Sequence, residues 1–363
     1  MMRNPSPEAS DSPSSDVPTM ADVARLAGVS PMTVSRVMND KTSVREKTRN
    51  KVYAAVAALN YSPNQAARRL AGSKPIRIGF LYSNPSAGYL SEFLVGLLNQ
   101  ASLNNVQLVV EKCEAGEHER EQTERLIANG VDGIILPPPL CDSPAIIELI
   151  AASNLPAVAV ACGLPDTRVS AVSIDDYQAA YVMTSHLITL GHQRIGFVIG
   201  HPNQTASARR LDGFRAAIAE HGAHDDAELV EQGMFTYRSG LDAAERLLSL
   251  ELRPTAIFAS NDDMAAAAVA IAHRMGLDVP GDLTVAGFDD TALATTIWPE
   301  LSTVRQPIAE MAETAATTLV RHIRARREGG GVDPEHIVMD FSLVRRQSDA
   351  APRMRPPAKL ASV

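Results

Sequence analysis

The hydrophobic positions along this chain follow two different patterns. Up to about residue 59 they recur every three or four residues, which is the period of amphipathic helices. After residue 75, short apolar runs alternate with further helical stretches, as in wound α/β proteins. The chain is therefore expected to contain a small all-helical head followed by a larger α/β part.

Three helices are expected in the head, at residues 20–27, 31–38 and 43–59. Thr19 and Asp22 have the spacing of a capping box at the start of the first helix, and Gly28 allows the sharp turn that ends it. Ser30 is placed to cap the second helix. Two short helices joined in this way form the helix-turn-helix arrangement, although a three-helix packing module without a DNA role would show the same periodicity.

The second helix is expected to be amphipathic. Val34 and Val37 would face the head core, and the opposite face would fit the major groove of DNA. Arg36 is the strongest candidate for reading a base, because an arginine can bond to both acceptors of a guanine edge. The other residues expected to point outward are Pro31, Met32, Thr33 and Ser35.

The charge of the chain is divided between the two parts. Between residues 19 and 75, ten Lys and Arg outnumber three Asp and Glu, whereas the whole chain of 363 residues carries a net charge of −8. The head therefore carries +7 and the remainder −15. This asymmetry predicts a head attracted to a polyanion and, combined with the turn spacing, favours DNA binding.

Ten strands are expected after residue 75, at residues 76–82, 107–111, 133–136, 157–161, 171–174, 194–199, 229–231, 256–259, 284–288 and 337–343. This number suits two lobes, each built on a parallel sheet. Ligands bind beyond the carboxyl ends of the strands in such sheets. The polar and aromatic residues expected there include Ser83, Asn84, Cys162, Phe235, Asn261, Asp262 and Asp289.

Several features bear on the compartment. The first 18 residues are rich in Ser, Pro and Asp without an apolar run, which predicts a disordered lead-in and not a secretory signal. No stretch approaches the roughly 18 consecutive apolar residues of a membrane span. The three cysteines form no CxxC pair, which favours reduced thiols over a metal site. A cytoplasmic protein without membrane contact, metal or cofactor is expected.

The head resembles the lactose and galactose repressor (LacI/GalR) family of bacterial transcriptional regulators. The matching segments are TMADVARLAGVSPMTVSRVMND at residues 19–40 and REKTRNKVYAAVAALNYSPNQAARRLAG at residues 45–72. The rest of the chain, to about residue 346, resembles the sensor of that family in element order. The resemblance implies two periplasmic-binding-protein-like lobes with parallel sheets flanked by helices. It also implies a homodimer or higher homo-oligomer on double-stranded operator DNA.

The expected domains are a lead-in at residues 1–18, a helix-turn-helix DNA-binding domain at 19–62, a hinge helix and linker at 63–75, an effector-binding and dimerisation domain at 76–346 and a disordered tail at 347–363. Within the sensor, lobe 1 is expected at about residues 76–174 and 308–332, and lobe 2 at about 175–304 and 333–346.

The resemblance also implies which residues contact DNA. Leu70 in the hinge helix would wedge into the minor groove, and Tyr61 and Asn64 would lie near the phosphate backbone. Pro31 and Met32 depart from the polar or aromatic residues that many relatives carry there, so the operator sequence is expected to differ. The full expected set is Thr19, Ser30, Pro31, Met32, Thr33, Ser35, Arg36, Asn39, Tyr61, Asn64, Ala67 and Leu70.

By the same motif matching, Arg210 in ARRLDGF corresponds to an effector-gripping arginine, Asn261 in SNDDMA to an asparagine and Asp289 in GFDDT to a carboxylate. Phe235 falls where relatives place a stacking aromatic, and Cys162 where some sugar-responsive members carry an acid. The full expected effector set is Ser83, Asn84, Cys162, Arg210, Phe235, Asn261, Asp262 and Asp289. Plainer roles remain open, since Asp262 could cap a helix, Arg210 could pair with a surface acid and Phe235 could belong to the core.

Planar groups with several hydrogen bonds and an aromatic ring suit a polyhydroxylated ligand. The sequence therefore predicts a repressor whose operator affinity is controlled allosterically by a small sugar or sugar derivative between the lobes, and no residue decides whether the ligand releases or tightens DNA binding. The chain has no GxSxG, Walker or GxGxxG motif, which argues against an enzyme. The alternatives are a solute-binding protein for sugar uptake and a regulator with a purine-like co-repressor.

Overall fold

The computed structural model describes residues 18–38, 44–59, 61, 75–83, 85–113, 116 and 118–353. The chain divides into two compact units, Met1–Pro75 and Ile76–Val363.

The first unit contains α1 (Met20–Ala27), α2 (Pro31–Met38) and α3 (Glu46–Ala58). The predicted capping box of α1 is confirmed, because the Asp22 N–H donates to Thr19 Oγ1 at 3.4 Å and the Thr19 N–H donates to Asp22 Oδ2 at 2.9 Å. Gly28 ends α1 in the left-handed conformation, with φ 65°. The first two helices thus have the bounds that their local signals predict.

The start of the third helix was predicted wrongly. Helix α3 begins at Glu46, and its N-cap residue Arg45 makes no side-chain capping bond. Ser43, the first residue of the predicted helix, lies outside the described residues. The three helices bury a small core to which Val23, Val34 and Val52 contribute.

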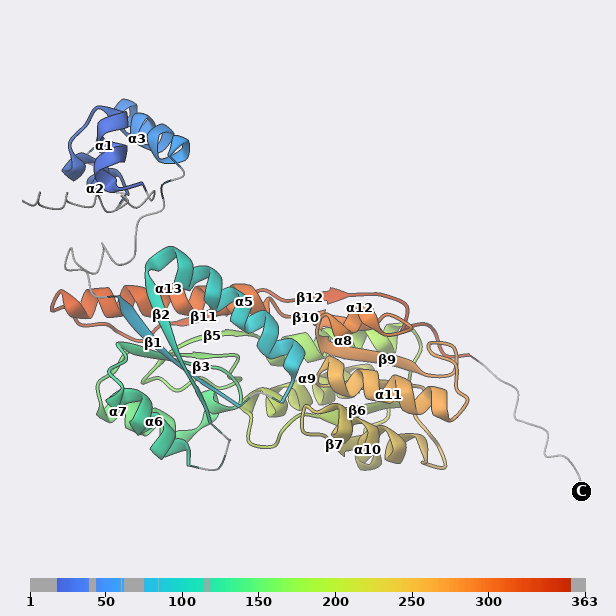
Figure 1. Ribbon diagram of the computed structural model, residues 1–363. Coiled ribbons are helices and arrows are strands. Elements are labelled where there is room, and N and C mark those ends of the chain that lie inside the picture. The colour runs from blue at the N-terminus through green and yellow to red at the C-terminus, as the bar shows by residue number, and fades with distance from the viewer. Residues whose placement is uncertain are drawn as a thin grey trace, which may run out of the picture. The chain divides into compact units, whose positions relative to one another are not determined.

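The second unit consists of two lobes that lie side by side (Figure 1), each built on a six-stranded sheet. The lobe 1 sheet has the order β11-β5-β4-β3-β1-β2, and all of its neighbouring pairs are parallel. Its strands are β1 (Ile76–Tyr82), β2 (Val106–Lys112), β3 (Gly133–Leu136), β4 (Ala157–Val160), β5 (Ser170–Ile174) and β11 (His336–Met339).

The lobe 2 sheet has the order β12-β10-β9-β8-β6-β7 and is parallel except that β12 runs antiparallel to β10. Its strands are β6 (Ile195–Ile199), β7 (Val230–Gln232), β8 (Ala256–Ala259), β9 (Thr284–Asp289), β10 (Ser302–Arg305) and β12 (Ser342–Val344). The prediction of two lobes with parallel sheets is confirmed.

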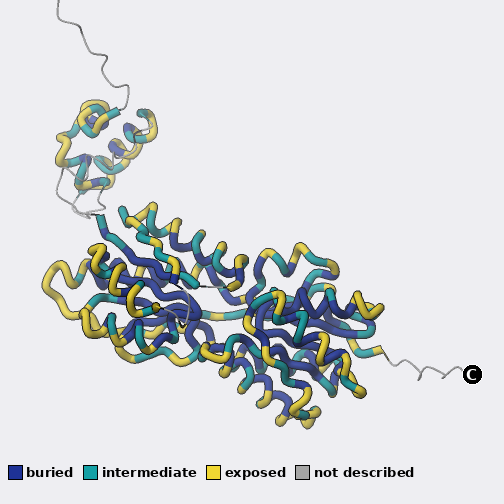
Figure 2. The backbone as a smooth tube through the Cα atoms, turned by 60° about the horizontal axis from the view of Figure 1, so that its bottom comes forward, coloured by how far each residue is buried: buried dark blue, intermediate teal, exposed yellow. Residues whose placement is uncertain are grey.

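Helices cover both sheets. In lobe 1 these are α5 (Ala87–Asn104), α6 (Glu119–Ala128), α7 (Pro144–Ala152) and α13 (Ile308–Arg327), with the short helix η1 (Leu140–Asp142). In lobe 2 they are α8 (Asp176–Thr189), α9 (Thr205–His221), α10 (Tyr237–Leu248), α11 (Asp262–Arg274) and α12 (Leu293–Thr296), with the short helix η2 (Ala227–Leu229). Figure 2 shows that buried residues are concentrated in the interior of both lobes. No helix of the described chain is long and apolar enough to cross a membrane.

The chain crosses between the lobes after β5, after β10 and after β11. The prediction of one strand at residues 337–343 is wrong, because β11 belongs to the lobe 1 sheet and β12 to the lobe 2 sheet. The predicted boundary of lobe 2 at residue 333 moves accordingly to a point between Met339 and Ser342. Strand β10 was not predicted.

The predicted disordered tail is wrong for residues 347–353, which pack against lobe 2. Ser348 is fully buried, and its hydroxyl donates to the Val285 carbonyl at 2.6 Å. Asp349 accepts from Ser302 Oγ at 2.5 Å and lies 2.7 Å from His186 Nε2. Buried polar groups with tertiary partners hold this segment in place. Its composition was therefore wrongly interpreted as a sign of disorder.

Candidate functional site

Helix α2 presents the exposed surface that the sequence predicts for DNA contact. Pro31, Met32 and Arg36 are exposed, whereas Val34 and Val37 on the other face are buried. Met32 is 67% exposed. The basic and apolar side chains of α2 are thus available to a second molecule.

The capping residues of the head are engaged in local bonds. Ser30 Oγ accepts from the Thr33 N–H at 3.2 Å and lies 2.9 Å from Thr33 Oγ1, and Ser35 is half-buried. Tyr61 is buried in the head core, so its ring is a packing residue of this unit. The remaining predicted DNA contacts, Asn39, Asn64, Ala67 and Leu70, lie outside the described residues.

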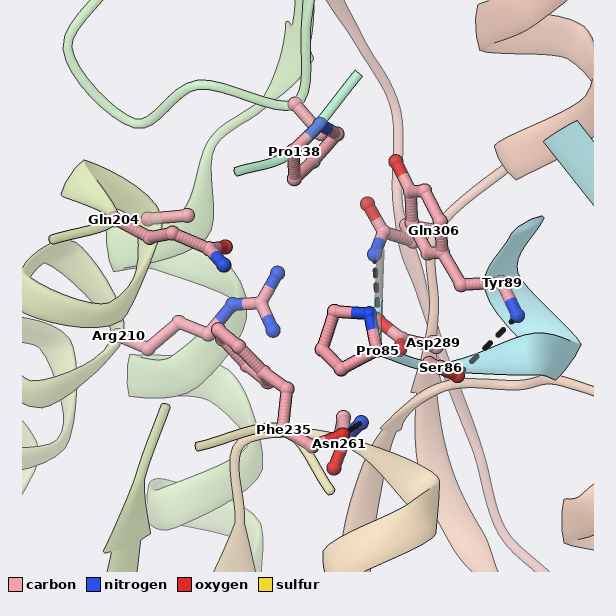
Figure 3. A pocket seen from close by; sticks show the side chains of 12 residues that line it. Pro85, Ser86, Tyr89, Pro138, Gln204, Arg210, Phe235, Asn261, Asp289 and Gln306 are labelled. Atoms are coloured by element: carbon pink, nitrogen blue, oxygen red, sulfur yellow. Dashed lines mark hydrogen bonds between the residues drawn. The ribbon is translucent and has the colours of Figure 1, made fainter. Parts of the chain in front are cut away.

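A pocket lies at the carboxyl ends of the strands and is lined from both lobes (Figure 3). Lobe 1 contributes Pro85, Ser86, Tyr89, Pro138 and Ala161, lobe 2 contributes Gln204, Ala206, Arg210, Phe235, Asn261 and Asp289, and Gln306 lies on the crossing that follows β10. The cavity volume is about 30 Å³. Since one ordered water needs about 10–15 Å³ in this measure, the cavity has room for only a few small groups.

Arg210, a predicted effector residue, lines the pocket and is held there by hydrogen bonds and a ring contact. It is buried on α9, its Nε donates to Asp176 Oδ1 at 2.8 Å and its Nη1 donates to the Ser260 carbonyl at 2.5 Å. Its guanidinium carbon lies 3.6 Å from the centre of the Phe288 ring, so the cation is also stacked. Burial raises the pKa of Asp176, while the Arg210 charge lowers it. Arg210 therefore pairs with an acid, but this acid, Asp176, is buried and not the surface acid that the alternative role supposed.

Asp289 and Gln306 form a polar pair on the side of the pocket that faces Arg210. Gln306 Nε2 donates to Asp289 Oδ1 at 2.6 Å, which leaves Gln306 Oε1 buried with no hydrogen-bond partner among the described residues. Burial raises the pKa of Asp289 well above its usual range, and nearby Asp262 raises it further against the opposing effect of Arg210. The Tyr89 hydroxyl is likewise buried and without a partner in the described part of the chain. Unpaired buried polar atoms of this kind are what a polar ligand would satisfy.

Phe235 borders the pocket in a strained conformation. Its φ is +57°, its carbonyl accepts from Asn261 Nδ2 at 3.1 Å, and Asn261 Oδ1 caps α11 by accepting from the Met264 N–H at 3.0 Å. A Cβ at Gly200 would lie 1.9 Å from Phe235 Cζ, so only glycine leaves room for the ring. Asn261 thus positions Phe235 and lines the pocket.

The pocket collects unusual backbone conformations. Ala161, Phe235 and Asp289 all have positive φ, at 55°, 57° and 108°. Such conformations cost about 1–3 kcal/mol each in residues other than glycine and cluster at functional sites. This is an indication of a binding site that does not depend on side-chain type.

Three predicted effector residues are not in the pocket. Asp262 is fully buried and accepts from the Thr291 N–H at 2.8 Å and from Thr303 Oγ1 at 2.7 Å, so it joins elements inside lobe 2. It is also not the helix cap considered as an alternative, because Asn261 holds that position. Cys162 is buried in the lobe 1 core, and Ser83 is half-buried at the end of β1. Asn84 lies outside the described residues.

Sequence reasoning missed all of the lobe 1 lining and, in the rest of the pocket, Ala206 and both glutamines. The missed residues are Pro85, Ser86, Tyr89, Pro138, Ala161, Gln204, Ala206 and Gln306. Pro85, Ser86 and Tyr89 lie within seven residues of the predicted end of β1. A search of the residues from that strand end to the first turn of the next helix would have found them. Nothing in the sequence marks Gln204 or Gln306.

Comparisons with known proteins agree with both units. Residues 19–64 match bacterial regulatory proteins of the lacI family, and residues 184–348 match a periplasmic binding protein-like domain. The HTH-type transcriptional regulator DegA of Bacillus subtilis is 35% identical over 335 residues, which cover 91% of this chain and 97% of DegA. Catabolite control protein A of Priestia megaterium is 33% identical over 332 residues, which cover 91% and 98% of the two chains.

Solved structures show the same architecture. The complex of the transcriptional regulator CelR with cellobiose has a TM-score of 0.70 at 30% identity and covers 92% of this chain and 100% of that chain. The Lac repressor dimer bound to operator and the anti-inducer ONPF has a TM-score of 0.67 at 30% identity with the same coverage.

A basic helical head followed by a two-lobed sensor with a pocket between the lobes defines a DNA-binding transcriptional regulator. This chain belongs to the lacI family of bacterial regulatory proteins.

Proposed function

We propose that this regulator is a repressor that binds a roughly twofold-symmetric operator as a homodimer and is controlled by a small sugar or sugar derivative in the pocket between its lobes. The observation that carries the proposal is the pocket itself, which Arg210 and Asp289 line and in which Gln306 Oε1 and the Tyr89 hydroxyl are buried without partners among the described residues. Cellobiose is the ligand named for CelR, which supports the sugar class.

The volume of the cavity supports allosteric control. A cavity of about 30 Å³ is too small for a monosaccharide, so binding requires the lobes or the lining side chains to move. A ligand that differs in affinity for two lobe arrangements shifts the balance between them. In this proposal, the shift changes how well the two DNA-binding heads of the homodimer fit the two half-sites of the operator.

DNA contact is assigned to a helix-turn-helix formed by α1 and α2, with Arg36 reading a base edge. The exposed face of α2 and the net charge of +7 on residues 19–75 support this assignment. The homodimer is supported by an apolar patch in lobe 1, where Val95, Leu98 and Leu103 on α5 and Val110 on the edge strand β2 are at least half exposed.

Selection of genomic fragments by the purified protein, at a stated near-physiological salt concentration, tests the proposal. The protein should enrich a palindromic site, and one member of a panel of sugars and purine bases should change its affinity. Arg36→Ala should lose at least about tenfold in affinity for that site. Arg25→Ala, which removes an exposed arginine paired with Asp22 on α1, is the matched control.

The outcomes separate the alternatives. A site that responds only to a purine base would replace the sugar class with the purine class. Failure to enrich any site would contradict the DNA role and favour a solute-binding protein.

A further inference from the structure

Helix α9 lacks a cap from its own lobe. It begins at Thr205 in lobe 2 and carries Ala206 and Arg210 to the pocket, as Figure 3 shows for Arg210. Its N-cap residue Gln204 makes no side-chain capping bond. The backbone N–H groups at the start of a helix need acceptors, and the helix dipole favours a negative charge there.

Lobe 1 provides the acceptor. Asp142, the last residue of η1, accepts from the Thr205 N–H at 3.1 Å through Oδ2 and from the Thr205 hydroxyl at 2.7 Å through Oδ1. The Thr205 hydroxyl oxygen in turn accepts from the Gly163 N–H at 2.8 Å and the Leu164 N–H at 3.0 Å, both in the loop between β4 and β5. One threonine of lobe 2 therefore exchanges four hydrogen bonds with lobe 1.

The fit between the lobes at this point is close. A Cβ at Gly163 would lie 2.7 Å from the Ala206 nitrogen, so only glycine allows the two backbones to approach this far. Asp142 is mostly shielded from water, and burial raises its pKa while the Thr205 bonds lower it. Separating the lobes would break all four bonds and leave the first turn of α9 without its acceptor.

A second polar contact joins the lobes at the α5 side of the pocket. Ser86 caps α5 by accepting from the Tyr89 N–H at 3.3 Å, and its hydroxyl donates to Asp263 Oδ2, in the first turn of α11, at 2.6 Å. Loss of the Asp142 contact would therefore leave this second contact intact, so the lobes would open without separating completely.

We propose that Asp142 and Thr205 form an interlobe cap, in which one lobe completes the N-terminus of the helix that carries Arg210 in the other. The cap makes lobe closure and the positioning of Arg210 a single event. Asp142 and Thr205 are positioning residues, because they act through α9 and do not line the pocket. That Arg210 is positioned to bind an effector rests on the proposed function. The cap itself requires no ligand.

Pulsed electron spin resonance on the full chain without ligand tests the cap. Spin labels at Arg120→Cys on α6 and Arg238→Cys on α10 report the distance between the lobes, and the three native cysteines are buried. Thr205→Val keeps the side-chain shape but removes the hydroxyl, and Asp142→Ala removes the acceptor. Each should raise the ratio of long to short distances by about 2- to 30-fold, the range of helix-cap losses.

The matched control is Thr189→Val, because the Thr189 hydroxyl bonds only within α8, to the Ser185 carbonyl at 2.8 Å, and should leave the distances unchanged. The double variant Asp142→Ala with Thr205→Val should open the lobes by less than the two single effects combined, because both changes remove the bond between the Thr205 hydroxyl and Asp142. Distances equal to those of the parent in both folded single variants would overturn the proposal. Opening in a protein that binds no ligand in this pocket would leave the cap in place and contradict only the proposed function.

Discussion

Tyr89 carries a polar atom whose burial has no compensation within the described chain. The hydroxyl lies in the wall of the pocket, and burial raises the pKa of Tyr89 well above its usual range. A buried hydroxyl without a partner destabilises a fold unless a bound molecule satisfies it.

We expect Tyr89→Phe to leave the melting temperature unchanged or higher and to weaken effector binding by about 2- to 13-fold, the contribution of one hydrogen bond. Thermal unfolding and titration calorimetry with the sugar that alters operator binding measure the two effects. Tyr181→Phe is the matched control, because its hydroxyl donates to Glu220 on the surface of lobe 2 at 2.7 Å. A variant with lowered stability and unaltered affinity would contradict the role of Tyr89.

Single residues also explain why the predicted site was incomplete. Ala161 has φ +55° at the end of β4, and this left-handed residue turns the chain so that Cys162 packs into the lobe 1 core while Ala161 lines the pocket. A sequence pattern that alternates inward and outward residues cannot register such a change. Arg210, Asn261, Asp289 and Phe235, which were predicted to contact an effector, line the pocket, and the first three lie in local motifs.

At the scale of elements, Asp262 ties three parts of lobe 2 together. It lies in the first turn of α11, and its carboxylate accepts from Thr291 after β9 and from Thr303 on β10. Burial raises the pKa of Asp262 to about 7, against the lowering effect of these bonds.

This raised pKa gives the stability a defined pH dependence. The folded state holds the proton more tightly than the unfolded state, whose pKa is near 3.8. The contribution of Asp262 is therefore fully present below about pH 4 and is lost as the pH rises to about 7, by an amount on the order of 4 kcal/mol. Asp262→Asn should remove this part of the slope, because an amide does not titrate in this range. The bond to Thr303 can be kept, because the Thr303 hydroxyl can rotate to accept from the amide.

Urea unfolding of the parent and Asp262→Asn between pH 4.5 and pH 8 measures the difference in free energy. Asp242→Asn on the surface of α10, where Asp242 pairs with Arg238, should retain the slope of the parent. Parallel curves for the parent and Asp262→Asn would contradict the assignment.

The elements that sequence reasoning found are those whose signals are local. The caps and turns of α1 and α2 lie within a few residues, and the apolar runs of most strands are continuous. Strand β10 was missed because it begins with two polar residues, Ser302 and Thr303, which are buried through bonds to Asp349 and Asp262. The break between β11 and β12 was missed because only Asp340 and Phe341 separate the two strands.

At the scale of the whole molecule, the apolar patch on α5 and β2 predicts an assembly. Leu98 is 57% exposed at its centre. We expect Leu98→Glu to convert a dimer into a monomer at micromolar concentration, because a charge in an apolar interface loses its hydration. The variant should also lose affinity for a palindromic operator, since one head would bind one half-site at a time.

Sedimentation analysis of the two proteins measures this change. Leu252→Glu, at an exposed leucine of lobe 2 outside the patch, should remain a dimer. A Leu98→Glu protein that sediments like the parent would contradict an interface at α5.

The three crossings between the lobes bear on how the protein is made. Lobe 1 requires β11, and lobe 2 requires β12 and residues up to Ala350, so neither sheet is complete until most of the chain has left the ribosome. The head needs only residues up to Tyr61 for its core. During synthesis, we therefore expect the head to fold while the sensor is still being translated, and the nascent chain to have a folded DNA-binding unit before it can respond to a ligand.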